Sequence, residues 1–434
     1  MFPFLPSLIY CFPLLKKPYF GEHITSFYSK RSNGMNRKFL LIIISICSLS
    51  LLTSCWNRKE LNELAIVVGM GIDIEDGKFV VTVQVVNPGE IAESQGGSGK
   101  SPVVVYQEKG NTLFEAIRRI TTVSPRKLYF SHLRLLVLGE EFAKKGIAKT
   151  LDLLSRDPEM RADFYIVVAK NKKAGDILKI VTTMERIPVQ QVFESLQSSE
   201  KAWATTIQIT MDQLIYDIIS EGISAKLTGI KLIGDVQDGG KLENTQQTKP
   251  TAFLKYDSIG VFRKDKFIGW LSESESKGLN YALGNVTSTV VTIPCPQKGK
   301  TAIELIHTTS ELNTEVSDHK PKGIIKVTTV GNVGNVQCKT LDLTKPETIS
   351  ILERETKKNI EHSINKSLYA ARKKYKIDPF GFGEALHRSN SDYWHLIKKD
   401  WLQILENMPV EIDVKVKIHN IGKIKNSPLN EIKN

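Results

Sequence analysis

Residues 65–86, AIVVGMGIDIEDGKFVVTVQVV, predict the hairpin on which the first sheet is built. Ala65 to Ile74 is apolar and rich in β-branched residues, as a buried strand is. Glu75-Asp76-Gly77 follows, and an Asp-Gly pair supports the positive φ angles of a tight turn. Lys78 to Asn87 predicts the return strand, which Pro88 ends. We therefore expect the folded part of the chain to begin with two antiparallel strands.

Helix and strand patterns alternate after this hairpin. Asn111 stands before an amphipathic run and is its predicted cap. Tyr129 to Leu138 predicts a strand, Phe142 to Ser155 a helix, and Phe164 to Ala169 another buried strand. This alternation is typical of a layered α/β domain.

The second half of the chain has a different pattern. Residues 234–250 are polar, contain three glycines, and predict a domain boundary or a long exposed hairpin. Ser272 with Glu275, and Thr344 with Glu347, each predict a capping box at the start of a helix. The second of these helices would be amphipathic over about 30 residues. Val410 to Ile418 alternates apolar and charged residues, which suits a strand of an antiparallel sheet with one wet face.

Together these patterns predict two or three domains behind an N-terminal lipoprotein signal peptide, with an α/β part first and antiparallel strands and helices after it. The predicted division is an upstream extension at 1–34, a signal peptide at 35–54, an N-terminal α/β part at 55–233, a polar linker or loop at 234–250, a C-terminal α+β domain at 251–422 and a flexible tail at 423–434.

Composition narrows the class of protein. The chain has 434 residues, 41% of them apolar, and a formal net charge of +12. A mild positive excess suits a protein near an anionic membrane surface. Nucleic acid is not indicated as a partner, because the sequence has no zinc-finger spacing, no RNP-like aromatic motif and no long basic run.

The cysteines point to no metal site. None of the five forms a CxxC pair, so we expect neither zinc nor another cofactor. Cys11 and Cys47 precede the predicted cleavage point. Cys295 and Cys338 are then the one pair available for an internal disulfide; we interpret them as two small buried thiols, with the disulfide as the alternative.

The leader has the anatomy of an export signal. From Met35 it reads MNRKFLLIIISICSLSLLTSC. Its uncharged run of about 14 residues is short for a transmembrane helix, which needs about 20. The run ends in a sequence that resembles a bacterial lipobox, and this predicts cleavage before the cysteine and acylation of it: Leu52, Thr53, Ser54 and Cys55. Because prolines interrupt the apolar residues of 1–34, we interpret Met35 as the true start.

We find no catalytic motif. There is no P-loop, no GxSxG and no HExxH. His387 and His395 flank Asp392, but their spacing does not favour a shared metal, and we interpret them as surface residues. Trp394 and Trp401 are seven residues apart and are predicted to pack in a core.

One basic cluster is a candidate partner surface. The segment SPRKLYFSHLR groups four side chains that could bind an acidic partner or a lipid headgroup: Arg126, Lys127, His132 and Arg134. A solvated basic face is the simpler interpretation.

Seven segments carry a resemblance to a known family. They are SCWNRKELNELAIVVGMGID, VTVQVVNPGE, SPRKLYFSHLRLLVLGEEFAKKGI, LLSRDPEMR, GVFRKDKFIGWLSESESKGL, IDPFGFGEALHRSNSDYW and PVEIDVKVKIHNIG. In this order they resemble the Ger(x)C lipoproteins, the C subunits of nutrient germinant receptors in endospore-forming bacteria. The resemblance runs from Cys55 to about Gly422.

The resemblance implies a multi-domain α+β fold, with mixed and antiparallel sheets packed with helices. It also implies a lipid-anchored, non-enzymatic subunit on the outer face of the spore inner membrane. Its partners would be two integral-membrane subunits, A and B, and its one transferable site residue is Cys55. Direct contact with the germinant stays open. The alternative function is a solute-binding lipoprotein of a transporter, which would have two lobes and a cleft between them.

Overall fold

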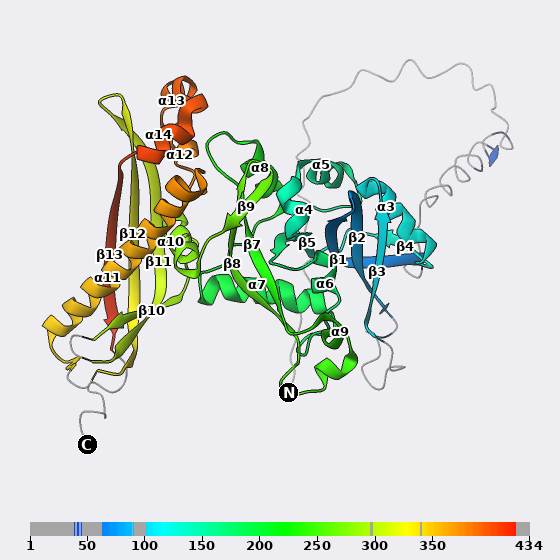
Figure 1. The fold of residues 1–434 in the computed structure, drawn as a ribbon, viewed down its shortest axis with the longest axis horizontal. Coiled ribbons are helices and arrows are strands. Elements are labelled where there is room, and N and C mark those ends of the chain that lie inside the picture. The colour runs from blue at the N-terminus through cyan, green and yellow to red at the C-terminus, as the bar shows by residue number, and fades with distance from the viewer. Residues whose placement is uncertain are drawn as a thin grey trace, which may run out of the picture. The chain divides into compact units, whose positions relative to one another are not determined.

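The computed structural model describes residues 63–88, 90, 101–295, 298–338 and 341–421, with four single positions before them at 39, 41, 42 and 45. Its described strands form one sheet of nine strands and one of four, with helices packed on both (Figure 1). The predicted α+β fold with mixed sheets is confirmed.

The predicted hairpin is present. β1 (Leu64–Glu75) pairs antiparallel with β2 (Lys78–Val86), and the register ends at Glu75 opposite Lys78. Asp76 and Gly77 have φ angles of 48° and 79°, as a two-residue hairpin turn requires. β3 (Val103–Gly110) extends the sheet beyond β2.

Parallel strands form the middle of this sheet. β5 (Leu135–Gly139) pairs with β1, β6 (Tyr165–Ala169) with β5, and β7 (Lys226–Ile233) with β6. The single strand predicted at 129–138 is in fact two, because a turn separates β5 from the short β4 (Lys127–Tyr129). Both lie parallel to β1, and every residue of β5 is buried, as is usual for a strand covered on both faces.

Helices cover the two faces of the nine-stranded sheet. On one face lie α3 (Leu113–Arg119), η2 (Ile120–Thr122), α4 (Glu140–Lys145), α5 (Ala148–Arg156) and α8 (Met211–Ile219). On the other lie α6 (Ala174–Leu178) and α7 (Pro188–Ala202). Here a Cβ on Gly69 would come within 2.5 Å of Val189, so the glycine lets α7 approach the strand.

Two helix predictions in this region need correction. The cap of α3 is Thr112 and not Asn111, because the Thr112 hydroxyl accepts a hydrogen bond from the backbone N–H of Glu115. The single helix predicted at 142–155 is divided into α4 and α5 by Gly146, whose φ of 118° lies outside the helical range.

The sheet continues past residues 234–250, which were predicted to be a domain boundary or a long exposed hairpin. β8 (Phe253–Arg263) pairs antiparallel with β7, and β9 (Lys266–Trp270) pairs with β8. The polar segment joins β7 to β8 and contains two short helices, α9 (Val236–Gly239) and η3 (Leu242–Thr245). It is thus the connection of a long hairpin inside one sheet.

The second sheet has the order β10 (Thr289–Pro294), β11 (Lys300–Ser317), β12 (Lys320–Val336) and β13 (Val410–Asn420). Its core face packs against α10 (Glu273–Leu283) and α11 (Pro346–Tyr369), which ends in the π-helical turn η4 (Ala370–Tyr375). The chain then forms α12 (Phe382–Ser389), α13 (Ser391–Ile397), η5 (Lys398–Asp400) and α14 (Trp401–Asn407).

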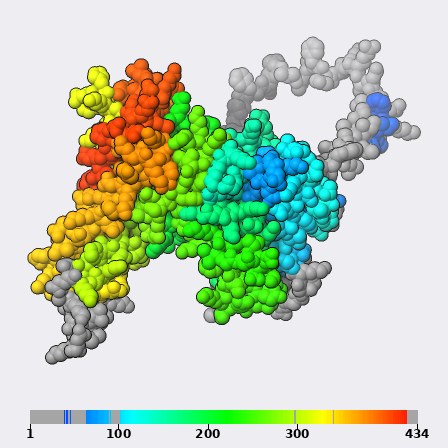
Figure 2. All heavy atoms as spheres, in the orientation of Figure 1, coloured from blue at the N-terminus to red at the C-terminus, as the bar shows by residue number. Residues whose placement is uncertain are grey.

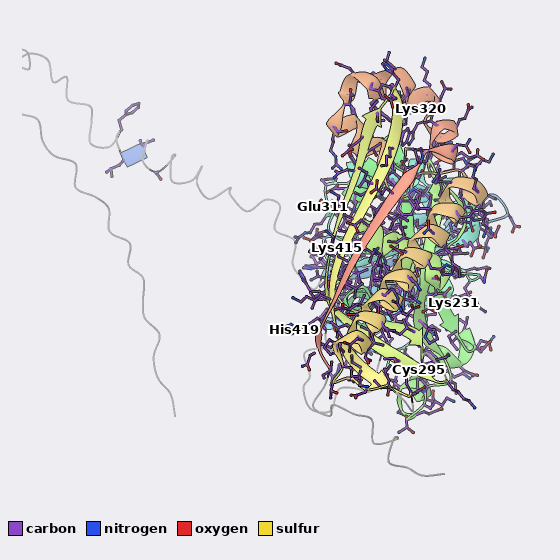
Figure 3. All side chains as sticks on the ribbon, turned by 90° about the vertical axis from the view of Figure 1, so that its left-hand side faces the viewer. Lys231, Cys295, Glu311, Lys320, Lys415 and His419 are labelled. Atoms are coloured by element: carbon purple, nitrogen blue, oxygen red, sulfur yellow. A yellow bond between two sulfur atoms is a disulfide. The ribbon has the colours of Figure 1, made fainter. Side chains whose placement is uncertain are left out.

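The last strand runs in the opposite sense to the one expected. β13 lies parallel to β12, because the helices from α11 to α14 carry the chain back to the other end of the sheet. Its alternating pattern arises because one face packs against α11 while the other is open. Glu311 and Lys415 lie on this open face (Figure 3).

One of the two capping boxes is confirmed. Ser272 and Glu275 form both reciprocal hydrogen bonds at the start of α10. The box predicted at Thr344 is wrong: α11 begins after Lys345 without a side-chain cap, and the Thr344 hydroxyl donates to Asp342 instead.

Cys295 and Cys338 form a disulfide, so the preference for two free thiols is wrong. Their Cα atoms are 5.8 Å apart, within the usual range for such a bond. Strand pairing explains their proximity. Pro294 lies opposite Lys300, and Thr301 lies opposite Val336, so the ends of β10 and β12 meet on either side of β11.

Reducing this bond is expected to lower the free energy of unfolding by about 2–4 kcal/mol, because it closes a long loop in the unfolded chain. The two cysteines are 43 residues apart in the sequence. Urea denaturation of the oxidised and reduced protein measures the effect, with the Cys295→Ala/Cys338→Ala variant as a control that should not respond to reductant. An unchanged midpoint after complete reduction would contradict the expectation.

Candidate functional site

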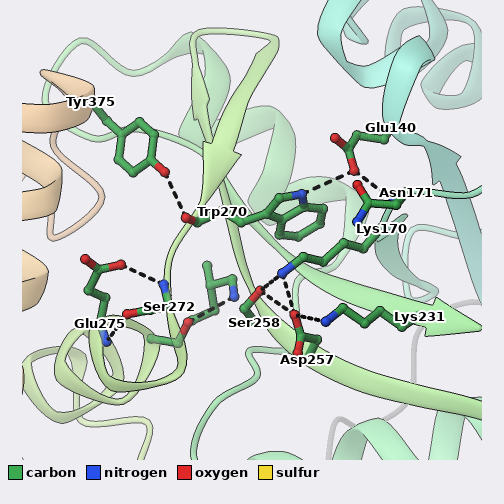
Figure 4. A network of polar contacts seen from close by, with 12 residues as sticks. Glu140, Lys170, Asn171, Lys231, Asp257, Ser258, Trp270, Ser272, Glu275 and Tyr375 are labelled. Atoms are coloured by element: carbon green, nitrogen blue, oxygen red, sulfur yellow. Dashed lines mark hydrogen bonds and ion pairs between the residues drawn. The ribbon is translucent and has the colours of Figure 1, made fainter. Parts of the chain in front are cut away.

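A lysine and a serine lie side by side where β6 ends. Lys170 Nζ donates to Ser258 Oγ over 2.8 Å and lies 4.8 Å from the centre of the Trp270 ring (Figure 4). Lys–Ser pairs can act in catalysis when the lysine is neutral. Here Lys170 also forms an ion pair with Asp257, and Lys231 approaches the same carboxylate to 3.1 Å.

The Asp257 carboxylate lies at the centre of this network and is shared by two lysines. Burial acts to raise the pKa of Asp257, but hydrogen bonds from Lys170 and Lys231 outweigh it and the pKa is lowered. Glu140 completes the network by accepting from Trp270 Nε1 and from the backbone N–H of Asn171. The network thus joins α4, β6, β7, β8 and β9, and we interpret it as structural. The sequence contains no motif that predicts this network.

The structure divides the predicted basic cluster between two sides of the nine-stranded sheet. His132 and Arg134 border a hollow beside α7, where the Arg134 guanidinium lies 5.5 Å from the Phe193 ring centre. Lys127 belongs to the side covered by α3 and α5. Arg126 is exposed just before β4. The four side chains therefore surround the amino end of β1 and do not form one binding site.

Lys127 stands at the rim of an apolar groove between α3 and α5, with a volume of about 370 Å³. The groove brings together two segments from the resemblance, SPRKLYFSHLR and LLSRDPEMR, which are distant in sequence. Apolar side chains line much of it: Phe114, Ile117, Leu128, Phe130, Leu154 and Met160. Charged side chains stand beside them: Arg118, Lys127, Arg156 and Glu159. The sequence pattern gives no sign that these two segments meet.

Ion pairs hold the rim of the groove. Lys127 Nζ lies 2.6 Å from Glu159 Oε1, and Ser131 Oγ donates to the backbone carbonyl of Glu159. On α3, the pKa of Glu115 is lowered because its carboxylate accepts from the backbone N–H of Asn111 and from Arg119. These contacts fix the rim but bring no acid, base or nucleophile together for a reaction.

The motif IDPFGFG, one of the segments of the resemblance, has a structural role. In IDPFGFG, the buried carboxylate of Asp378 accepts four hydrogen bonds, from the backbone N–H groups of Gly381, Phe382 and Gly383 and from Trp401 Nε1. The Trp401 and Trp394 rings pack edge to face with centres 5.4 Å apart, and both are buried, so the predicted tryptophan core is confirmed.

The two histidines near this core do not form a metal site with Asp392. Their ring centres are 5.7 Å apart. In the described part of the chain, no group of three His, Cys, Asp or Glu side chains is placed to hold a metal ion. Among the same residues, no helix combines the length and apolar character that crossing a bilayer needs.

The predicted lipidation site, Cys55, and its lipobox residues Leu52, Thr53 and Ser54 lie outside the described residues. So do the extension at 1–34 and the tail at 423–434. The first continuous described stretch begins eight residues after Cys55, at Glu63, and enters β1 at Leu64.

Comparisons with known proteins cover nearly all of the folded chain. A family model described as the spore germination protein N-terminal domain matches residues 57–232. A second, described as spore germination B3/GerAC like, C-terminal, matches residues 257–422. The two models divide the chain at the β7–β8 connection.

Two curated relatives are similar along almost their whole length. Spore germination protein KC of Bacillus subtilis (strain 168) is 30% identical over 403 residues, which are 91% of this chain and 98% of that protein. Spore germination protein B3 of the same organism is 23% identical over 380 residues, covering 86% and 95%. The crystal structure of the GerBC protein has a TM-score of 0.52 at 20% identity, covering 81% of this chain and 97% of that one, and supports the fold.

Proposed function

The chain belongs to the Ger(x)C family of spore germination proteins, and from this premise we propose that it is the lipid-anchored C subunit of a nutrient germinant receptor. It would act with two integral-membrane subunits, A and B, on the outer face of the spore inner membrane. The observation that carries the proposal is the match of both family models across 57–232 and 257–422, directly after the lipobox cysteine.

Three features support an anchored, non-catalytic subunit. The sequence before Cys55 has the charge, apolar run and lipobox of an exported lipoprotein. Two or three acyl chains on Cys55 would anchor it stably, since each buried CH₂ contributes about 0.8 kcal/mol. The described polar networks serve the fold, with no nucleophile placed beside a free base.

The alternative of a transporter's solute-binding lipoprotein has no observation in its favour. That class binds its ligand between two α/β lobes. The second sheet here has one parallel strand pair and does not repeat the first sheet.

Deletion of the gene in the spore former tests the receptor role. We expect spores that respond weakly or not at all to at least one nutrient, with the response restored by the wild-type gene supplied elsewhere. Normal germination with every nutrient, in a strain without a second family member, would refute the proposal.

Cys55→Ala is expected to prevent both acylation and cleavage, because the processing depends on the lipid-modified cysteine. The N-terminal peptide of the wild-type protein should begin with acylated Cys55, whereas the variant should keep its leader. Mass spectrometry of the N-terminal peptide of the unprocessed variant also decides between Met1 and Met35 as the start. Cys47→Ala, in the same leader, is the matched control and should be processed normally. An unmodified wild-type Cys55 would contradict the anchor.

A further inference from the structure

The chain between the predicted anchor and the fold ends beside a basic edge of the molecule. Leu64, the first residue of β1, lies opposite Lys127 of the parallel strand β4. Nine residues, 56–64, would separate the acylated Cys55 from this point. At about 3.3–3.6 Å per residue, they reach about 30 Å at most. If the proposed anchor holds, the amino end of β1 stays close to the bilayer.

This edge carries an excess of positive charge. Residues 111–129, from α3 to β4, contain four arginines and lysines but a single glutamate. Arg118, Arg119, Arg126 and Lys127 are all exposed. Arg119 pairs with Glu115 and Lys127 with Glu159, whereas Arg126 forms no ion pair within the described part of the chain. The surface therefore suits an anionic partner.

Large apolar side chains are exposed among these charges. Phe114 on α3 and Val123 after η2 are each 50% exposed. The Arg118 guanidinium lies 4.9 Å from the centre of the Phe114 ring. Figure 2 shows the cyan atoms of this region on the outside of the folded chain, at its right-hand margin. Exposed apolar groups among basic ones are typical of surfaces that lie in the headgroup layer of a membrane.

We propose that α3, η2 and the start of β4 form a membrane-docking edge that binds anionic phospholipid headgroups. Arg118, Arg126 and Lys127 contact the headgroup phosphates, and Val123 and Phe114 enter the boundary between headgroups and acyl chains. The lipid on Cys55 holds the protein on the membrane; the docking edge sets its orientation there. The apolar groove beside α5 opens on this same edge. The inference rests on the proposed anchor, which places the membrane near β1.

A fluorescent label at position 123 tests the orientation. The mature lipidated protein is purified with Val123→Cys, or with Leu396→Cys as the control, since Leu396 is 80% exposed on α13. Cys295 and Cys338 are paired and should not react with the label. Each protein is placed on vesicles that carry headgroup-attached quenchers, either neutral phosphatidylcholine or a mixture with about one-third phosphatidylglycerol.

We expect quenching at position 123 on anionic vesicles to exceed that at 396 by about threefold or more, and to fall in about 0.5 M salt. The Arg118→Glu/Arg126→Glu variant should lose this quenching. Lys415→Glu/Lys417→Glu, which changes the charge equally on the far strand β13, should keep it. Weak quenching at 123 on anionic vesicles overturns the proposal, as does equal quenching on neutral vesicles, and the edge would then be a surface for a protein.

The anchor and the docking edge are read out separately. Retention of the protein on neutral vesicles reports the lipid on Cys55, because no headgroup charge contributes there. Quenching at position 123 on anionic vesicles reports the docking edge. Failure of retention alone therefore counts against the anchor, while salt-sensitive quenching in the same protein would still support the docking edge.

Discussion

Asp378→Ala is expected to lower the free energy of unfolding by about 3–5 kcal/mol. The side chain is 1% exposed, and its carboxylate accepts four hydrogen bonds. Three of the donors are consecutive backbone N–H groups from Gly381 to Gly383, and the fourth is Trp401 Nε1. Alanine would leave all four buried donors without an acceptor, each at a cost of about 1–3 kcal/mol before the structure relaxes.

Because of the position of Asp378, its replacement is expected to destabilise the whole fold and not only its own loop. Its backbone N–H donates to Ser224 Oγ and its carbonyl accepts from the Ser224 N–H, so the loop is tied to the chain before β7. Thr314 of β11 donates to the carbonyl of Phe382 in the same loop. The loop thus contacts segments next to both sheets, and its rearrangement should affect both.

Matched variants separate the acceptor from the volume of the side chain. Asp378→Asn keeps the shape but turns an amide N–H₂ toward two of the four donors, so it should cost nearly as much as alanine. Trp401→Phe removes one donor and should cost less than Asp378→Ala. Asp400→Ala, an exposed carboxylate next to Trp401, should change stability by less than about 0.5 kcal/mol. Urea midpoints measure all four; an Asp378→Asn protein as stable as wild type would contradict the argument.

Local sequence patterns predicted those features well that depend on residues close together in the sequence. The hairpin at 65–86 followed from a β-branched run and an Asp-Gly turn, and both torsion angles agree. The Ser272 capping box followed from two side chains in adjacent turns. Trp394 and Trp401 lie in a core as predicted, although they belong to two helices, α13 and α14, and not to one.

Errors occurred where distant segments decide the outcome. The alternation in β13 reports that α11 covers one of its faces, and it says nothing about the direction of its neighbour. The Cys295–Cys338 bond depends on the registers of β10 and β12 against β11. The few residues around each cysteine do not determine these registers. Nothing in the sequence therefore indicated that the two cysteines lie side by side, and free thiols were the simpler interpretation.

The candidate site shows the same limit. The basic character of SPRKLYFSHLR was evident from sequence, but the sheet places Lys127 on one side and Arg134 on the other. Phe114 and Arg118 join Lys127 at the docking edge because α3, which packs on β2 and β3, borders the same groove as β4. Only the pairing of Leu64 with Lys127 places this edge next to the end of the tether.

Lys226→Met is expected to destabilise the fold by about 3–5 kcal/mol, because it leaves a buried carboxylate without its counter-charge. Lys226 at the start of β7 and Asp217 on α8 are each 3% exposed, and Lys226 Nζ lies 3.2 Å from Asp217 Oδ2. Burial raises the pKa of Asp217, and the charge of Lys226 opposes that shift. Without the lysine, the pKa of Asp217 should rise further.

The expected rise in the pKa of Asp217 predicts how the stability of the Lys226→Met variant depends on pH. A carboxyl whose pKa is higher in the folded than in the unfolded state makes stability fall as the pH rises through the folded pKa. The loss in Lys226→Met should therefore be smallest in acid and grow toward neutral pH. Urea midpoints of wild type and variant across the acid-to-neutral range measure it, and a loss that is independent of pH would contradict an uncompensated Asp217 as its cause.

Removing both charges should restore much of the stability. In Asp217→Ala/Lys226→Met no buried charge is left, and methionine, being unbranched and flexible, can occupy the path of the lysine stem. We expect the double variant to lose several kcal/mol less than the sum of the two single variants, which defines their coupling. Lys241→Met breaks the exposed pair with Asp238 and should have little effect. If the two single losses instead add in the double variant, Lys226 and Asp217 do not act as a pair, and the cost lies in packing around β7.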